Sequence, residues 1–316
     1  MNIYNLLKKI LIRLKYIFLL NPKKRLFRKL SFYSIHKNPS FLRISSSPYV
    51  SGDTFRNYAD HVFDETSSIM PKKIKKGETI FLKTDLKKIF FSEFHNKIKV
   101  PYILVSHNSD QSIGNQDLRY IDDYIIHWFA MKLNVNMDNR ISPIPAGLEN
   151  YRYLNNGIIK NFTKVLKNNS EKNIKIKKVL CSFNPYTNKN EREPLIQIAK
   201  KIENIDIKNF SNNIDYLNSL SLYEYNLCPE GNDFESHRLW ETLFFNNIPV
   251  VKQNIVNSNF SKIGVPLVMI KDWELLMYEN LFPTLENFHK NKQSTPSNYV
   301  KFEFWKSRIE KYRSTI

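Results

Sequence analysis

Residues 226–251 read NLCPEGNDFESHRLWETLFFNNIPVV, and this stretch sets the expectation for the whole fold. An apolar run ends at Cys228, and a Pro-Glu-Gly-Asn turn follows it, although the chain has only seven glycines. Leu239, Leu243 and Phe244 then recur at the spacing of one helix face. The pattern predicts a strand at about 222–228, a turn at 229–234, a helix that starts at Glu235 or Ser236 and ends near Asn246, and a strand at 248–252.

The same pattern of an apolar run followed by a polar turn recurs along the chain. Examples are YILVSHN (102–108), DYIIHWFAMKLN (123–134), KKVLCSFN (177–184) and VPLVMIKD (265–272). The runs are continuous rather than alternating, which is typical of strands buried in a parallel sheet. Helical patterns occupy 190–203, 235–247 and 299–316. This alternation predicts an α/β protein with parallel sheets.

The length of 316 residues favours two domains, at about 100–200 residues each. A polar segment rich in Asn and Lys, residues 151–176, separates them. We therefore expect a basic arm at 1–40, one α/β domain at 41–170, a second at 171–295, and a final helix at 296–316. Two such domains enclose a cleft, and ligands of parallel sheets bind beyond the carboxyl ends of the strands.

The opening stretch carries groups suited to a sugar nucleotide. A helix start favours an anion, because its free N–H groups and dipole are positive. Arg238 and Glu241 are neighbours on one face of the predicted helix. A guanidinium suits a diphosphate, and a carboxylate accepts from the two hydroxyls of a ribose. Gly231 and Asn232 permit a tight or left-handed turn and close approach of a ligand. The alternative is a local Arg-Glu ion pair on a solvated helix.

CPEGNDFESHRLWETLFFNNIPVV resembles the C-terminal donor-site signature of exostosin-like glycosyltransferases. That signature has a strand ending in a Pro-x-Gly turn, an Arg-x-x-Glu helix and a Pro-Val pair, and a similar arrangement occurs in fucosyltransferase-type GT-B enzymes. The KDWE sequence at 271–274 also fits, so the likeness covers residues 222–274. Glu230 departs from the pattern, which has a basic or polar residue at this place.

The resemblance implies the GT-B fold: two Rossmann-like domains with parallel sheets facing a cleft, and a C-terminal helix crossing back onto the N-terminal domain. It places the acceptor mostly in the first domain and a UDP- or GDP-linked sugar, as substrate, in the second, with no cofactor and no metal. The sequence contains no Asp-x-Asp, the carboxylate pair that holds a metal-bound diphosphate. Arg238, with Arg192 or Lys189, would then neutralise the leaving group. The residues expected to bind the donor are Arg192, Glu230, Gly231, Asn232, His237, Arg238 and Glu241.

Sugar transfer with inversion needs a general base for the acceptor hydroxyl. Asp53 lies in a Gly-Asp turn, and His107 and Asp110 follow the strand at 102–105. These three residues are the candidate bases, and the alternative for each is a turn-capping role. His127, within IIHWF, is expected to be a buried strand or helix residue.

The N-terminal arm predicts membrane association. The chain has a net charge of +18, ten Lys and Arg fall in residues 1–40, and no acidic residue precedes Asp53. Apolar residues of 1–20 follow one helix face, and no run is long enough to span a bilayer, which takes about 20 residues. The cations expected at an anionic membrane are Lys8, Lys9, Arg13, Lys15, Lys23, Lys24 and Arg25. The alternatives are a helix packed on the protein body and a nucleic-acid arm, but no stacking aromatics or nucleic-acid module accompany it.

Together these features predict a glycosyltransferase on the inner face of the cytoplasmic membrane. Cys181 and Cys228 end apolar runs without any CxxC or disulfide pattern, which favours buried thiols in the cytosol. The expected acceptor is a lipid-linked glycan, as in lipopolysaccharide or capsule synthesis, and no nucleic-acid partner is expected. The alternatives are another nucleotide-dependent transferase of surface-polysaccharide synthesis and a non-catalytic peripheral membrane binding protein.

Overall fold

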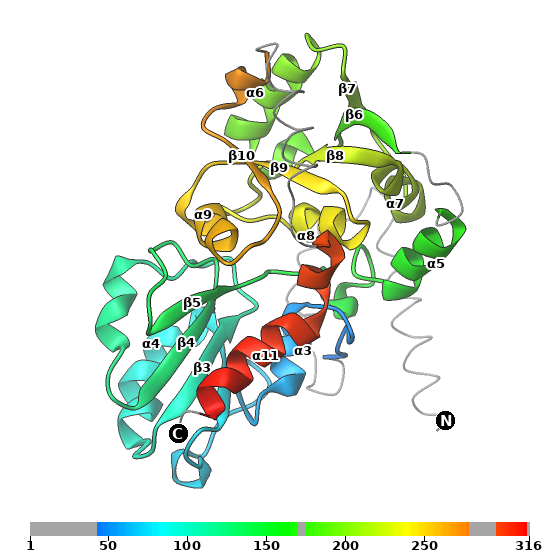
Figure 1. Cartoon of the computed structure of the whole chain (residues 1–316). Coiled ribbons are helices and arrows are strands. Elements are labelled where there is room, and N and C mark those ends of the chain that lie inside the picture. Colours follow the sequence, from blue (N-terminus) through cyan, green and yellow to red (C-terminus); the bar gives the residue numbers. More distant parts are fainter. Residues whose placement is uncertain (1–42, 170–174, 278–294, 315–316) are drawn as a thin grey trace, which may run out of the picture.

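The computed structural model describes residues 43–169, 175–277 and 295–314 (Figure 1). The predicted membrane-associating arm lies outside these residues, so its role stays a prediction. Two parallel five-stranded sheets form the protein, in the orders β1-β2-β3-β4-β5 and β10-β9-β8-β6-β7. The strands of the first sheet are β1 (His61–Phe63), β2 (Thr79–Lys83), β3 (Tyr102–His107), β4 (Ile125–Met131) and β5 (Ile141–Ile144). Those of the second are β6 (Ile176–Cys181), β7 (Ile205–Ile207), β8 (Tyr223–Leu227), β9 (Ile248–Lys252) and β10 (Val268–Ile270).

Helices connect the strands and cover the sheets. They are α3 (Gly52–Tyr58), α4 (Lys87–Ile89), α5 (Ile159–Asn169), α6 (Lys189–Ala199), α7 (Asn213–Leu222), α8 (His237–Phe244), α9 (Ile255–Lys262) and α11 (Phe302–Arg313). Short 3₁₀ helices link others, among them η8 (Tyr151–Tyr153), η10 (Trp273–Met277) and η11 (Pro296–Val300). The parallel α/β prediction is confirmed, because every strand pair in both sheets is parallel.

The second sheet has a point at which its strand order reverses. β6 pairs with β7 on one side and with β8 on the other. The chain that leaves β6 and the chain that leaves β8 therefore diverge, and a crevice opens between them at the carboxyl ends. The PEGNDFES turn (229–236) follows β8 at this point and leads into α8.

One apolar cluster joins the two halves of the protein. Trp240 of α8 packs edge-on against Phe260 of α9 and Trp305 of α11, with ring centroids 5.1 and 6.0 Å away. All three aromatic side chains are at most 1% exposed. Because the cluster also includes residues of the first sheet, such as Val105, the two halves pack through a shared core.

The C-terminal helix crosses back, as the predicted GT-B arrangement requires. η11 packs on α8 in the second half, and α11 then runs along β3 and β4 of the first half (Figure 1). Near its end, Tyr312 stacks on His127 of β4 with ring centroids 3.9 Å apart. His127 is fully buried in its strand, as expected. The fold is thus α/β of GT-B type.

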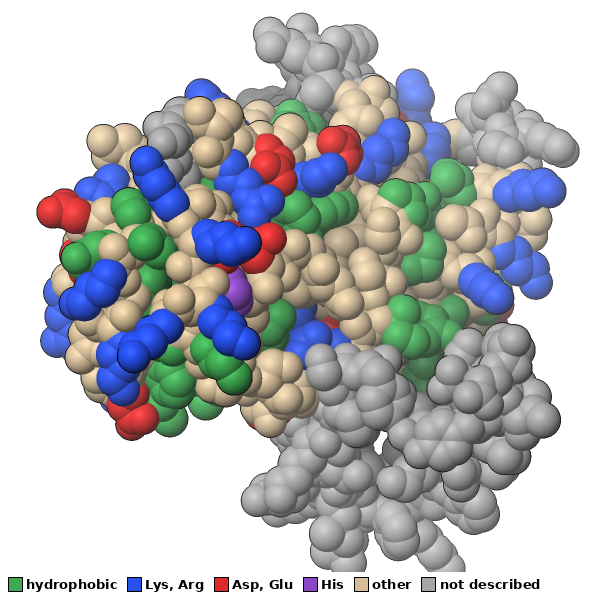
Figure 2. Space-filling model, turned by 90° about the horizontal axis from the view of Figure 1, so that it is seen from below, with side chains coloured by type: hydrophobic (Ala, Val, Ile, Leu, Met, Phe, Trp, Pro, Cys, Tyr) green, Lys and Arg blue, Asp and Glu red, His purple; other side chains and the backbone are tan. Residues whose placement is uncertain are grey.

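The structure also bears on other features that were predicted from the sequence. The polar segment 151–176, which was expected to separate the two domains, contains α5, and this helix buries Phe162 and Val165. Cys181 and Cys228 are buried free thiols. No helix in the described ranges is both long and apolar enough to cross a membrane. The face shown in Figure 2 carries many Lys and Arg side chains, in keeping with the net charge of +18.

Candidate functional site

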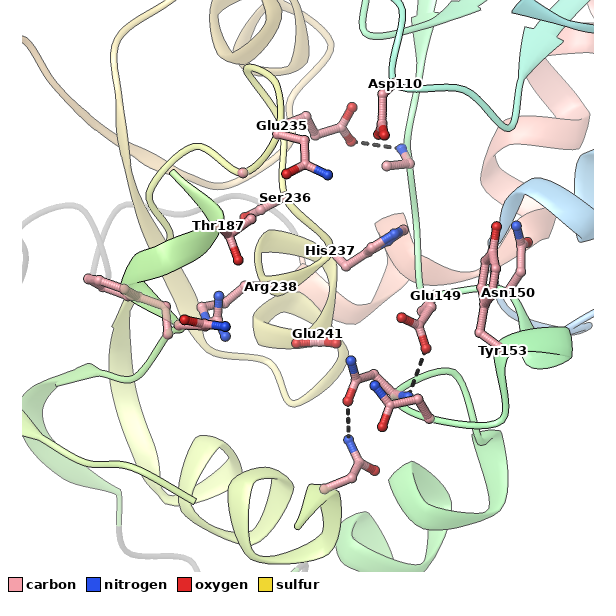
Figure 3. Close-up of a pocket in the computed structure, with 18 of the residues that line it drawn as sticks. Asp110, Glu149, Asn150, Tyr153, Thr187, Glu235, Ser236, His237, Arg238 and Glu241 are labelled. Atoms are coloured by element: carbon pink, nitrogen blue, oxygen red, sulfur yellow. Dashed lines mark hydrogen bonds between the residues drawn. The ribbon is translucent and has the colours of Figure 1, made fainter. Parts of the chain in front are cut away.

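A cavity of about 1060 Å³ lies where the carboxyl ends of both sheets meet (Figure 3). Loops that follow β3, β4 and β5 line it from the first half, and loops that follow β6, β7 and β8 line it from the second. The start of α8 forms part of its wall. Both sheets therefore present the end at which parallel α/β proteins bind ligands to one shared space.

The start of α8 offers unpaired polar groups to this cavity. Ser236 is the N-cap residue, but its side chain makes no capping hydrogen bond. Among the described residues, Ser236 Oγ and Arg238 Nε are buried atoms without a hydrogen-bond partner. The first N–H groups of a helix also lack intrahelical partners, and its dipole makes this end positive. The arrangement is suited to an anion that would satisfy these donors.

Two guanidinium groups lie together at this end of the cavity. Arg192 and Arg238 flank Phe183, at 5.5 and 6.0 Å from its ring centroid. Arg192 donates to the carbonyl oxygens of Glu230 and Asn184, both at 2.8 Å. Burial and then the charge of Arg238 lower the pKa of Arg192 to about 10, so it stays protonated at neutral pH. Within the described chain neither guanidinium forms an ion pair with a carboxylate.

Glu241 is held by Tyr216 rather than by Arg238. The Tyr216 hydroxyl donates to Glu241 Oε2 at 2.8 Å, and Arg238 lies over the Tyr216 ring at 5.5 Å. The alternative of a local Arg238–Glu241 ion pair is therefore not what the structure contains. Glu241 is 4% exposed and lines the cavity beside Arg238. The Glu241 carboxylate can therefore accept a hydrogen bond from a ligand in the cavity.

The turn before α8 differs in detail from the prediction. Gly231 and Asn232 line the cavity, but Gly231 does not have the left-handed backbone that was considered for it. Glu230 does not line the cavity, because its carboxylate accepts from Asn254 Nδ2 at 2.9 Å. Glu230 instead acts on the site through its carbonyl oxygen, which positions Arg192.

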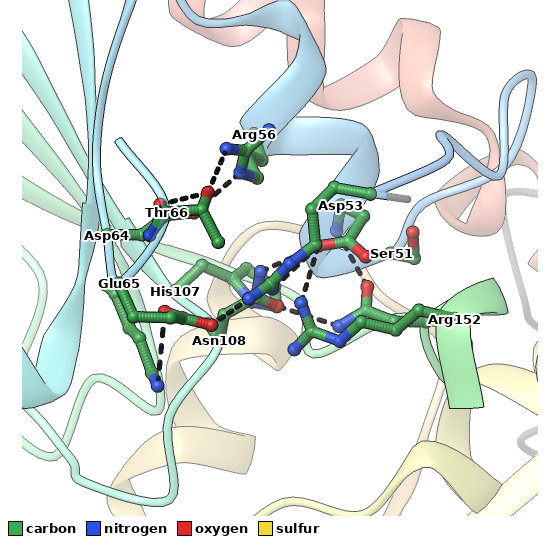
Figure 4. Close-up of polar contacts among 12 residues, drawn as sticks. Ser51, Asp53, Arg56, Asp64, Glu65, Thr66, His107, Asn108 and Arg152 are labelled. Carbon is green, nitrogen blue, oxygen red and sulfur yellow. Dashed lines mark hydrogen bonds and ion pairs between the residues drawn. The ribbon is translucent and has the colours of Figure 1, made fainter. Parts of the chain in front are cut away.

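Asp53 lies outside the cavity lining, in a buried polar network (Figure 4). Its Oδ1 is 3.5 Å from Arg43 and 3.3 Å from Arg152, and it accepts from Asn108 Nδ2 at 3.0 Å. The side chain is fully buried. This position argues against the predicted role of Asp53 as the base, since no acceptor hydroxyl could reach it.

His107 lines the cavity, but both of its ring nitrogens are engaged. Nδ1 accepts from the Asn108 N–H at 2.7 Å, and Nε2 donates to the Pro145 carbonyl at 2.9 Å. Burial lowers the pKa of His107 to about 3. The ring therefore has no free lone pair for a substrate proton. Asp110 lies at the rim with its side chain 77% exposed, and it pairs with Lys132 at 3.3 Å.

The structure adds residues that the sequence did not single out. Glu235 is 5% exposed and lines the cavity, and its Oε1 accepts from the Ala146 N–H at 2.7 Å and from Trp240 Nε1 at 2.5 Å. Lys132 contacts Asp110 and also Asp233, at 3.8 Å, and so connects loops of the two halves. The acidic residues of the GNDFE turn were the available signal, but the sequence does not tell which of them faces inward.

In the part of the chain that the structure describes, no group of three or more His, Cys, Asp or Glu side chains could hold a metal ion.

The sequence matches no family model and no curated protein. The solved structures that are similar in part include the following two. One is HepE of Anabaena in complex with UDP-glucose, with 11% identity and a TM-score of 0.38 over 75% of this chain and 79% of that one. The other is the GtfA/B complex, with 12% identity and a TM-score of 0.37 over 77% of this chain and 59% of that one. At these scores neither structure assigns an activity to this chain.

Proposed function

We propose that the protein is a glycosyltransferase that moves a sugar from a nucleoside-diphosphate donor to a hydroxyl of a glycan. The observation that carries the proposal is the pair of guanidiniums of Arg192 and Arg238, which have no carboxylate partners in the described chain. They lie near the first turn of α8, where Ser236 Oγ has no hydrogen-bond partner. A diphosphate matches two adjacent cations and a helix start in both charge and hydrogen-bonding geometry.

A mechanism of sugar transfer follows from the same groups. The diphosphate lies against Ser236 and Arg238, and the ribose hydroxyls donate to Glu241. The sugar then points toward the first half, from which the acceptor enters. As the bond between the sugar and the diphosphate breaks, negative charge accumulates on the leaving phosphate, and the two guanidiniums stabilise it without having to move.

Finer features of the proposal rest on the sequence. The Pro-x-Gly turn, Arg238 and Glu241 support an exostosin-like or fucosyltransferase-like donor site. We propose that transfer is independent of metal, that residues 41–170 bind the acceptor and that residues 171–295 bind the donor. The basic composition of residues 1–40 supports a peripheral enzyme on the cytoplasmic membrane whose acceptor is lipid-linked.

A thermal-shift experiment tests the donor site. UDP or GDP, added in the presence of EDTA, should raise the melting temperature of the whole chain. Arg238→Ala and Glu241→Ala should each abolish the rise. Lys189→Ala is the matched control, because Lys189 is a neighbouring cation that is 63% exposed, pairs with Glu193 and lies off the cavity. Normal nucleotide binding by both site variants would disprove this donor site, and a requirement for added metal would disprove metal independence.

A further inference from the structure

The side chain of His237 joins the two halves through one of its ring nitrogens. His237 is the first residue of α8, and its Nδ1 lies 2.7 Å from the carbonyl oxygen of Gly147 in the first half. A carbonyl oxygen can only accept, so Nδ1 carries the hydrogen. The other ring nitrogen, Nε2, then holds a lone pair in the neutral imidazole. The contact therefore sets the tautomer that a general base requires.

The position of the Gly147 carbonyl is itself constrained. Gly147 has φ +68°, and a Cβ at this residue would lie 2.5 Å from the Val50 carbonyl oxygen. The backbone at Gly147 also forms an antiparallel bridge with Ser51. The acceptor of the His237 bond is thus held by local packing in the first half, and this fixes the orientation of the imidazole ring.

The second ring nitrogen of His237, Nε2, is left without a partner in the described part of the chain. His237 is exposed and lines the cavity, and no hydrogen bond to Nε2 occurs among the described residues. Figure 3 shows the ring pointing from α8 toward the side of the cavity that carries Glu149 and Asn150. Glu149 lines the cavity too; burial raises its pKa, and a positive charge on His237 acts against this rise. A nearby carboxylate would stabilise the imidazolium that forms when Nε2 takes up a proton.

His237 is also better placed for the role of base than the three residues that were expected from the sequence. His237 immediately precedes Arg238, and the side chains of both residues line the cavity. Of the bases expected from the sequence, Asp53 is outside the cavity and His107 has no free lone pair. Asp110 is at the solvent-exposed rim, paired with Lys132.

We propose that His237 is the general base of transfer, a proposal that rests on the proposed function. Nε2 takes the proton of the acceptor hydroxyl while the hydroxyl oxygen bonds to the anomeric carbon. The bond from that carbon to the diphosphate oxygen breaks, and its electron pair leaves with the nucleoside diphosphate. Because this is a single displacement, the anomeric configuration is inverted.

Two substitutions separate the base from the bridge to Gly147. His237→Asn places an amide Nδ2 where it can still donate to the Gly147 carbonyl, but it provides no basic nitrogen. His237→Ala removes both functions and leaves space for free imidazole. The assay is release of UDP or GDP from UDP-glucose or GDP-mannose, with water as the acceptor. Both variants should lose at least about 100-fold in rate, while the nucleotide-induced thermal shift persists. Added imidazole should restore activity to His237→Ala.

His61→Ala is the matched control, because His61, on β1, pairs with Glu78 and does not line the cavity. Its rate should equal that of the wild type and should not respond to imidazole. A wild-type rate in His237→Asn would overturn the base role. Loss of nucleotide binding in His237→Ala without imidazole rescue would also overturn it and would make His237 a donor-binding residue. If the wild type neither binds nor cleaves any of these compounds, the proposed function itself fails, and the base role falls with it.

Discussion

Replacing Glu235 by glutamine should stabilise the folded protein near neutral pH while leaving it unchanged in mild acid. The Glu235 side chain is 5% exposed, and its Oε1 accepts hydrogen bonds from Ala146 and Trp240. Its Oε2 is buried without a partner among the described residues. Burial raises the pKa of Glu235 from 4.5 to about 7. A glutamine has the same shape, can accept the same two bonds through its Oε1, and does not ionise.

The size and sign of the effect follow from the two pKa values. Below about pH 4.5 the carboxyl group is protonated whether the chain is folded or unfolded, so the stability it contributes is fully present. As the pH rises, the unfolded chain releases the proton first, and the contribution is lost until the folded group ionises near pH 7. Between about pH 5 and pH 8 the wild type should lose about 2.5 kcal/mol relative to Glu235→Gln.

Urea unfolding of both chains across this pH range measures the difference directly, with tryptophan fluorescence as the signal. Glu303→Gln is the control, because it makes the same chemical change on α11 at a side chain that is 79% exposed rather than buried. The reasoning is refuted if the advantage of Glu235→Gln does not grow with pH. That result would mean that the charges of Lys132 and His237, which lower the pKa of Glu235, outweigh its burial.

Four further predictions concern packing and the N-terminal arm. Gly52→Ala should destabilise the protein by about 1–3 kcal/mol in urea unfolding, because its Cβ would lie 1.8 Å from Asn108 Oδ1. Gly231→Ala should cost less than about 0.5 kcal/mol, since its nearest new contact is at 3.7 Å, although nucleotide affinity in the thermal-shift titration should fall if the ligand approaches this backbone closely. Trp305→Ala should cost about 3–5 kcal/mol, because the side chain is 1% exposed between the two halves. Deletion of residues 1–30 should reduce sedimentation with anionic vesicles and leave nucleotide binding unchanged, at about 1 kcal/mol per cation near the membrane; unchanged sedimentation would rule out the anchor.

The strands were predictable because each of them is buried and forms a run of consecutive apolar residues. The strand expected at 248–252 is β9, with the same bounds. Helices with a strong apolar face, such as α8 and α11, were also found. α9 was not, because two of its four buried residues are asparagines. Asn259 donates to the carbonyl oxygens of Leu133 and Val135 in the first half, at 3.1 and 2.7 Å. A polar residue that is buried by a partner far away in sequence resembles a surface residue when the sequence is read locally.

The part of the cavity wall that α8 contributes was predictable for the same reason as β9: its residues are local in sequence. Arg238, Glu241 and His237 fall on one turn of one helix, and all three line the cavity. Phe183 and Tyr216 were missed because they come from separate loops and helices, and an aromatic residue beside a strand usually belongs to the core.

Asp53 shows that the chemistry of a residue and of its sequence neighbours does not by itself reveal the role of that residue. A carboxylate in a turn has the right chemistry for a base, but two arginines from distant segments surround it. Asn108 donates to Asp53 and accepts from Asn150 Nδ2 at 2.9 Å, and both asparagines line the cavity. Asp53 thus supports this wall of the cavity from the protein interior. The difference between a carboxylate that accepts a substrate proton and one that orients the residues around a substrate lies in which groups fold against it, and those groups lie up to 99 positions along the chain.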